Sequence, residues 1–146
     1  MPKYMWYIVA ILIVGAAYFS FEAGLIMFLW NADVSKLSFL IIALFIKSYT
    51  KLGVLLHSNK KVTFDDLDSG YEDSELSMAI GMLGTVIGFI VMTTAFAGVD
   101  LSVVENIKEL FGIATSGMST ALLTTAAGLV SSIILRTSYY LTGRHQ

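Results

Sequence analysis

Two stretches of the chain contain no ionisable side chain at all: Leu76 to Val99 and Phe111 to Leu135. A third apolar stretch, Tyr4 to Trp30, is interrupted only by Glu22. About 20 apolar residues form a helix long enough to cross the roughly 30 Å of hydrocarbon in a bilayer. The sequence therefore predicts an integral membrane protein, an all-α polytopic helical bundle.

A fourth apolar stretch, Leu37 to Leu56, is marginal because it is apolar only as far as Ile46 and then carries Lys47 and Lys51. It spans a membrane only if Lys47 extends its ammonium group toward the lipid headgroups. We expect four transmembrane helices. The alternative is three, with residues 37–57 forming a surface or cytoplasmic helix.

Composition excludes several classes of function. The chain is 56% hydrophobic and only 14% charged, whereas about 25% of residues are charged in an ordinary soluble domain. There is no cysteine, and the net charge of -2 comes without a basic tract that would suit nucleic acid. No nucleophile–base pair, phosphate loop or metal-ligand cluster is present, so we expect no enzyme activity, no cofactor and no metal.

The polar segments suggest an organisation in three parts. Residues 1–57 are predicted to be an N-terminal transmembrane hairpin, residues 58–75 a short charged cytoplasmic connection, and residues 76–146 the core. We expect Ser74 to cap the helix after this connection, and Ser102 with Glu105 to cap a short helix ending near Gly112. The acidic run within the connection lacks the ligand spacing of an EF-hand and is interpreted as solvated.

Most basic residues fall on the side that would hold both termini and the 58–75 connection if all four helices span the membrane. The positive-inside rule then predicts that both termini are cytoplasmic.

Small residues recur at helical spacing in both uncharged stretches. They are Gly81, Gly84 and Gly88 in the first, and Gly117, Ala121 and Gly128 in the second. Such faces let two helix backbones approach closely in lipid. Tight packing without any further role is an equally good interpretation of this pattern alone.

Hydroxyl side chains accompany these small residues. Ser116, Thr120 and Thr124 are spaced by four, Thr125 follows directly, and Thr85 lies in the other stretch. A single membrane Ser or Thr usually donates to the carbonyl four residues earlier in its own helix. The alternative is that several of them line a narrow polar path through the membrane.

Two motifs in these stretches resemble a known family. Gly-Met-Leu-Gly-Thr-Val-Ile-Gly at 81–88 is similar to the glycine–threonine segment of the MotA/TolQ/ExbB proton channel family. Ala-Leu-Leu-Thr-Thr-Ala-Ala-Gly-Leu at 121–129 is similar to a second motif of the family, especially in TolQ and ExbB. The two motifs occur in the right order on adjacent spans, which makes the resemblance specific.

The resemblance implies a multi-pass protein of the bacterial inner membrane that powers a motor. Members form homo-oligomeric rings, typically pentamers, around a single-span partner of the MotB/TolR/ExbD group, whose membrane aspartate takes up and releases the proton. Thr85 and Thr125 match the threonines that face this aspartate. The chain departs from TolQ and ExbB at Thr120, where those proteins carry a glutamate.

The missing charge supports this interpretation independently. Threonine hydroxyls orient water but cannot store a proton at neutral pH, so a proton-coupled device built on these helices needs a carboxylate from elsewhere. Glu22 is the alternative proton site, although it could instead lie at the outer interface and pair with Lys36. Two other functions stay open: an autonomous, holin-like pore, and a structural oligomer without ion flow.

Overall fold

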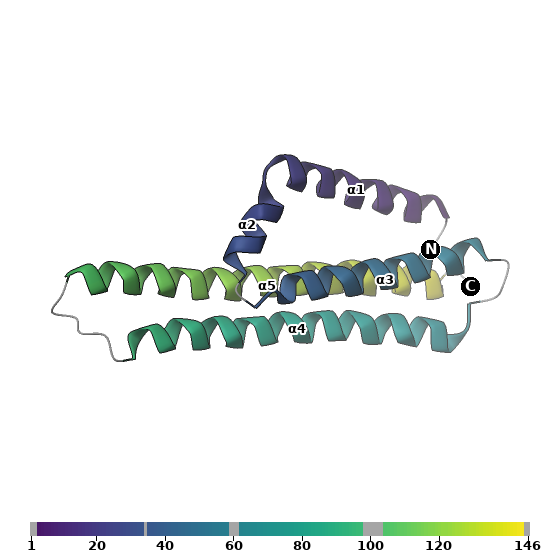
Figure 1. Cartoon of the computed structure of the whole chain (residues 1–146). Helices are drawn as coiled ribbons and strands as arrows, with labels where there is room; N and C mark the ends of the chain where they lie inside the picture. The colour runs from purple at the N-terminus through teal and green to yellow at the C-terminus, as the bar shows by residue number, and fades with distance from the viewer. Residues whose placement is uncertain (1–2, 34, 59–61, 98–103, 145–146) are drawn as a thin grey trace.

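The computed structural model describes residues 3–33, 35–58, 62–97 and 104–144. This part of the chain is all-α (Figure 1). Its five helices are α1 (Lys3–Glu22), α2 (Leu25–Ala32), α3 (Leu37–His57), α4 (Phe64–Phe96) and α5 (Val104–Arg144). Of these, α1, α3, α4 and α5 are long and apolar enough to cross a membrane. Residues 37–57, the marginal stretch, are therefore one of four candidate spans.

The apolar stretch from Tyr4 to Trp30 is not one continuous helix. α1 ends at Glu22, and the chain turns at Gly24, whose φ of 69° lies in the left-handed region that glycine adopts without a Cβ clash. The turn closes with a hydrogen bond from the Gly24 amide to the Phe21 carbonyl at 3.1 Å. α2 then runs in a different direction and leads down to α3 (Figure 1).

α4 begins earlier than the sequence analysis predicted. Its N-cap is Thr63, which forms a capping box with Asp66, and the Thr63 amide donates to Asp66 Oδ2 at 3.2 Å. The prediction that Ser74 caps this helix is wrong, because Ser74 lies inside α4 and its hydroxyl donates to the Tyr71 carbonyl at 2.7 Å. The acidic run forms the first turns of α4, where carboxylates interact favourably with the helix dipole.

α5 is also longer than expected. It runs without interruption from Val104 to Arg144, so the prediction of a separate short helix ending near Gly112 is wrong. The predicted capping pair of Ser102 and Glu105 lies outside the described residues and side chains.

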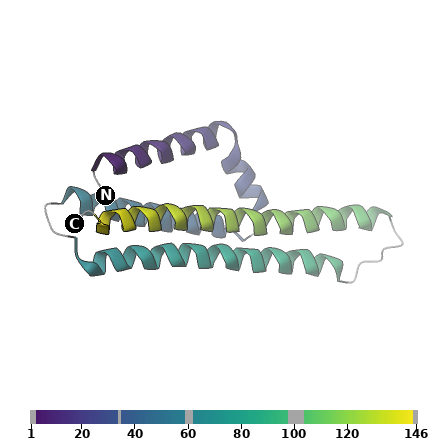
Figure 2. The same ribbon diagram turned by 180° about the vertical axis from the view of Figure 1, so that it is seen from behind.

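α4 and α5 form a long antiparallel pair, and α3 lies alongside it (Figures 1 and 2). The first turn of α1, the last turn of α3, the first turn of α4 and the last turn of α5 lie at the same end of the bundle (Figure 1). The small hydrophobic core is at this end. It consists of Tyr49 and Leu52 from α3 with Leu135 and Tyr139 from α5.

A buried carboxylate connects α3 to α4 beside this core. Asp73 of α4 accepts a hydrogen bond from the Ser48 hydroxyl, and its Oδ1 lies 3.5 Å from Lys47 Nζ. The Tyr139 hydroxyl of α5 donates to the Ser48 carbonyl at 3.0 Å, so all three helices meet here. Lys51 donates to the Ser69 hydroxyl at 2.9 Å. Both lysines that made the stretch from Leu37 to Leu56 marginal thus interact with polar groups of α4.

Candidate ion pathway between α4 and α5

The two longest helices pack backbone against backbone. A Cβ added at Gly88 would lie 2.5 Å from the Gly117 carbonyl oxygen and 2.8 Å from the Ala121 Cβ. One added at Gly117 would lie 2.6 Å from the Gly88 carbonyl oxygen. Real Cβ contacts are not this short, so at these two positions only glycine permits the observed approach.

The same contact continues toward the core end of the pair. A Cβ at Gly81 would lie 3.1 Å from the Gly128 Cα, and one at Gly84 would collide with the Thr124 side chain. The small residues singled out in the sequence, Gly81, Gly84, Gly88, Gly117, Ala121 and Gly128, therefore all lie in one helix–helix contact.

Thr85 and Thr125 meet across this contact. Their hydroxyl oxygens share a hydrogen bond between α4 and α5. A carbonyl of the same helix is also within hydrogen-bond distance of each oxygen, Gly81 at 3.3 Å from Thr85 and Ala121 at 2.7 Å from Thr125. Because a hydroxyl has one proton, the threonine that donates across the contact does not donate within its own helix. The pair thus combines the local bond that is usual for a membrane threonine with a bond between the two helices. That Thr85 and Thr125 line an ion path stays a prediction.

A cavity of about 330 Å³ opens beside the two threonines. Among the described residues its lining comes from side chains of α4 and α5: Thr85, Phe89, Met92, Met118, Ala121, Leu122 and Thr125. No ionisable group is among them. The cavity therefore offers two hydroxyls in an otherwise apolar wall, which can hydrogen-bond a guest but cannot exchange a proton with it.

The other predicted hydroxyls lie elsewhere. Thr120 and Thr124 are fully buried, and the Thr124 hydroxyl donates to the Thr120 carbonyl at 2.7 Å. Thr124 fills the space over Gly84 in the helix contact, and Ser116 is half-buried outside the cavity lining. A role for these three residues in an ion path stays a prediction.

Glu22 lies at the end of α1 and is exposed. Its carboxylate accepts a hydrogen bond from Tyr18 at 3.2 Å. The expected pair with Lys36 does not form, because Lys36 donates to the Trp30 carbonyl and places its ammonium 4.1 Å from the centre of the Trp30 ring. Glu22 does not line the threonine cavity.

The sequence analysis missed the apolar part of the lining and the buried carboxylate Asp73. The lining could have been found from periodicity: Phe89 and Met92 follow Thr85 by four and seven residues, and Met118 and Leu122 precede Thr125 by seven and three. Asp73 carried no comparable signal, because it lies in a run of carboxylates that are otherwise exposed or half-buried.

The fold and the site together define a polytopic helical membrane protein with an uncharged, hydroxyl-bearing cavity between two closely packed helices. Residues 74–145, which include α5 and most of α4, match the family model of the MotA/TolQ/ExbB proton channel family. This half of the chain belongs to that family, and the resemblance predicted from its two motifs is confirmed. The chain has no significant match among curated proteins or among solved structures.

Proposed function

We propose that the chain is the ring-forming subunit, typically five copies, of a proton-driven motor or stator in the bacterial inner membrane. It conducts ions together with a single-span partner of the MotB/TolR/ExbD kind that bears a membrane aspartate. Membership of a proton channel family supports the proton as the ion that is conducted. The observation that carries the proposal is the hydrogen-bonded pair of Thr85 and Thr125 in a cavity without a carboxylate.

The physical requirement for a partner follows from this cavity. Proton coupling needs a group that titrates near neutral pH, and α4 and α5 carry none between Leu76 and Thr94 or between Phe111 and Leu135. An aspartate from a partner helix would be stabilised, when charged, by the two hydroxyls and by water. When protonated, it would pack against the apolar lining as a neutral side chain. Alternation between these two states would drive movement of the partner within the ring.

The test replaces each threonine by valine, which has the same shape but no hydroxyl. The chain would be reconstituted in liposomes with a single-span chain encoded beside it that bears a membrane aspartate. We expect Thr85→Val and Thr125→Val each to lower proton flux about tenfold, because a hydrogen bond to a charged group contributes about 1.5–3 kcal/mol. The matched control is Thr115→Val on α5, whose hydroxyl is exposed and donates only to the Phe111 carbonyl.

The same preparation separates the other functions. An autonomous pore would conduct without the partner, and a structural oligomer would conduct neither alone nor with it. Glu22→Gln is expected to leave flux unchanged, because Glu22 lies outside the cavity. Abolished flux in this variant, with both threonine variants active, would place the proton site on α1 and overturn the proposal.

A further inference from the structure

Four exposed carboxylates form a stripe on the first turns of α4. Asp65, Asp68, Glu72 and Glu75 are spaced by three and four residues, so they share one helix face. This face points away from α5, because it is opposite the face with Gly70 and Gly81 that packs on α5. Within the described residues none of the four forms an ion pair, whereas the buried Asp73 pairs with Lys47.

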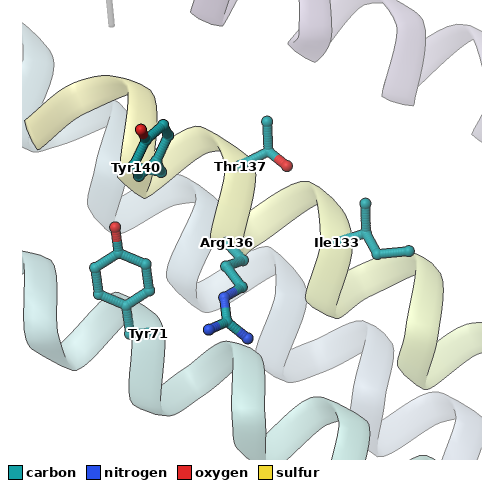
Figure 3. Close-up of a pocket in the computed structure, with 5 residues that line it drawn as sticks. All are labelled: Tyr71, Ile133, Arg136, Thr137 and Tyr140. Atoms are coloured by element: carbon teal, nitrogen blue, oxygen red, sulfur yellow. The ribbon is translucent and has the colours of Figure 1, made fainter. Parts of the chain in front are cut away.

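The end of α5 carries exposed basic and tyrosine side chains at the same end of the bundle. Arg136, Thr137 and Tyr140 line an open groove of about 560 Å³ together with Ile133 and with Tyr71 of α4 (Figure 3). Arg144 follows one turn after Tyr140 and is also exposed. Neither arginine forms an ion pair within the part of the chain that the structure describes.

The outer face of α5 is likewise turned away from α4. Thr137, Tyr140 and Arg144 lie opposite the buried side chains of Leu135 and Tyr139. Each subunit therefore presents an acidic stripe at one edge of the α4–α5 pair. Thr137, Tyr140 and Arg144 lie at the other edge, and beside them Arg136 lies in the groove that Tyr71 of α4 also lines (Figure 3).

The acidic stripe of α4 and the basic end of α5 lie at the same height, that is, at the same position along the helix axes. Gly70 lies against the Tyr139 ring, and the methyl carbon Cδ1 of Leu67 would lie 3.1 Å from a Cβ at Gly143, which fixes the antiparallel register of α4 and α5. In this register Glu72 is level with residue 137, Asp68 with residue 141 and Asp65 with the last turn of α5. Rotation about an axis parallel to the helices keeps every height unchanged, so in a ring these groups of neighbouring copies would meet.

We propose that the acidic stripe of α4 in one copy docks on the groove end of α5 in the next copy. Glu72 then lies beside Arg136, and Asp65 lies beside Arg144. This contact rests on the ring of the proposed function and specifies how its subunits join. It is heterologous, since each copy uses two different surfaces, and such contacts close into rings when the rotation permits.

Charge complementarity favours a second copy of the chain, rather than lipid, as the partner that covers these two surfaces. Toward the cavity end both edges expose apolar side chains, such as Val86 and Ile90 on α4 and Leu122 and Leu129 on α5. Lipid chains cover such surfaces as well as a protein does. They supply no charge opposite the acidic stripe or the arginines, whereas a second copy places Arg136 at the height of Glu72 and Arg144 at the height of Asp65.

Disulfide trapping tests the contact, because the chain has no cysteine of its own. Glu72→Cys and Thr137→Cys in one chain place the thiols on opposite outer edges, so an intrachain bond is out of reach. Mild oxidation in membranes is expected to give a ladder of covalent multimers. The matched control, Asp65→Cys with Thr137→Cys, shifts one thiol by seven residues, about 10 Å along the helix, and should give no ladder.

A charge exchange provides the second measurement. Arg136→Glu should lower the oligomeric fraction in detergent by roughly tenfold, and Glu72→Arg in the same chain should restore it. An oligomer that conducts with its partner but gives no ladder from the matched cysteines would overturn this contact and leave the proposed function intact. A matched ladder without ion flux would support the contact and contradict the function. An anionic phospholipid retained by the purified protein but lost in Arg136→Ala would show that lipid fills the groove, which also overturns the contact.

Discussion

The α4–α5 pair and the N-terminal helices are held in place by different means. α4 and α5 touch along their length through glycine, alanine and threonine, so their backbones themselves are in contact. α1 is attached near its first turns, where Trp6 stacks on Tyr49 of α3 with ring centroids 5.6 Å apart. Much of α1 lies apart from the other helices (Figure 1).

This difference has a consequence for function. Contacts between backbones leave little freedom for α4 and α5 to move against each other, so the backbones beside Thr85 and Thr125 are held close together. α1 packs on the core through Trp6, Val9, Ala10 and Ile13, which leaves its second half to lipid or to other subunits. The family match lies on the closely packed pair, at residues 74–145, and does not include α1, α2 or α3.

The largest effect is expected from breaking the close pair. Gly88→Ala places a Cβ 2.5 Å from the Gly117 carbonyl oxygen, which belongs to backbone and cannot rotate away. Overpacking of this kind costs about 1–3 kcal/mol or more. The thermal midpoint in detergent should fall clearly, and flux with the partner should be lost because the threonines separate.

Gly112→Ala is the matched control for this variant. It makes the same change on α5, where nothing lies within 4 Å of the new Cβ. Its thermal midpoint should equal that of the unmodified chain or exceed it, because alanine favours the helix. Equal midpoints for the two variants would mean that α4 and α5 are not packed through their backbones.

Much of this comparison could be predicted from the sequence. The absence of charge predicted the membrane helices, and the spacing of Gly81, Gly84 and Gly88 indicated a packing face without saying which helix it meets. That Thr85 and Thr125 meet was implied only by resemblance to the family. Local spacing cannot give it, because it depends on the register between two helices.

Two features could not be read from the sequence for identifiable reasons. The start of α4 at Phe64 was missed because the run of acidic residues was interpreted as a polar loop. Carboxylates also stabilise the first turn of a helix. The division between α1 and α2 depends on the left-handed φ of Gly24. A single glycine within an apolar stretch is compatible with either a helix or a turn.

A smaller effect is expected from loosening α1. Trp6→Ala removes an indole that stacks on Tyr49 and covers Gly53. Because this side chain is half-buried, the loss should be about 2 kcal/mol, roughly half that of a fully buried indole. Protease cleavage in α1 should become faster while flux with the partner stays. Tyr4→Ala, at a largely exposed side chain on the same helix, should change neither. Loss of flux in Trp6→Ala would show that the N-terminal helices also shape the cavity.

The smallest effect concerns the turn between α2 and α3. Burial raises the pKa of the Asp33 carboxyl. Hydrogen bonds from Ser38 and Ser35 lower this pKa by more than burial raises it, so the net pKa lies below 3.8. The Asp33 carboxylate accepts from the Ser38 amide at 2.9 Å and so caps the start of α3. Since the folded pKa is the lower one, this contribution is complete above about pH 3.8 and is lost as the pH falls through the folded pKa.

Asp33→Asn should therefore lower the stability at pH 7 by about 1 kcal/mol, the typical difference between a hydrogen bond to a charged acceptor and one to a neutral acceptor. Thermal melts of both proteins across the acid range should converge below the folded pKa, where the unmodified carboxyl is protonated and equally unable to hold the charge-assisted bond. A constant difference at every pH would mean that the stabilisation comes from the shape of the turn rather than from the charge.

Because α3 carries Ser48 and Lys47, which hold Asp73 of α4, this turn also tests whether weakening the N-terminal region is transmitted to the close pair of α4 and α5. We expect no transmission, so proton flux with the partner should be the same in Asp33→Asn as in the unmodified chain.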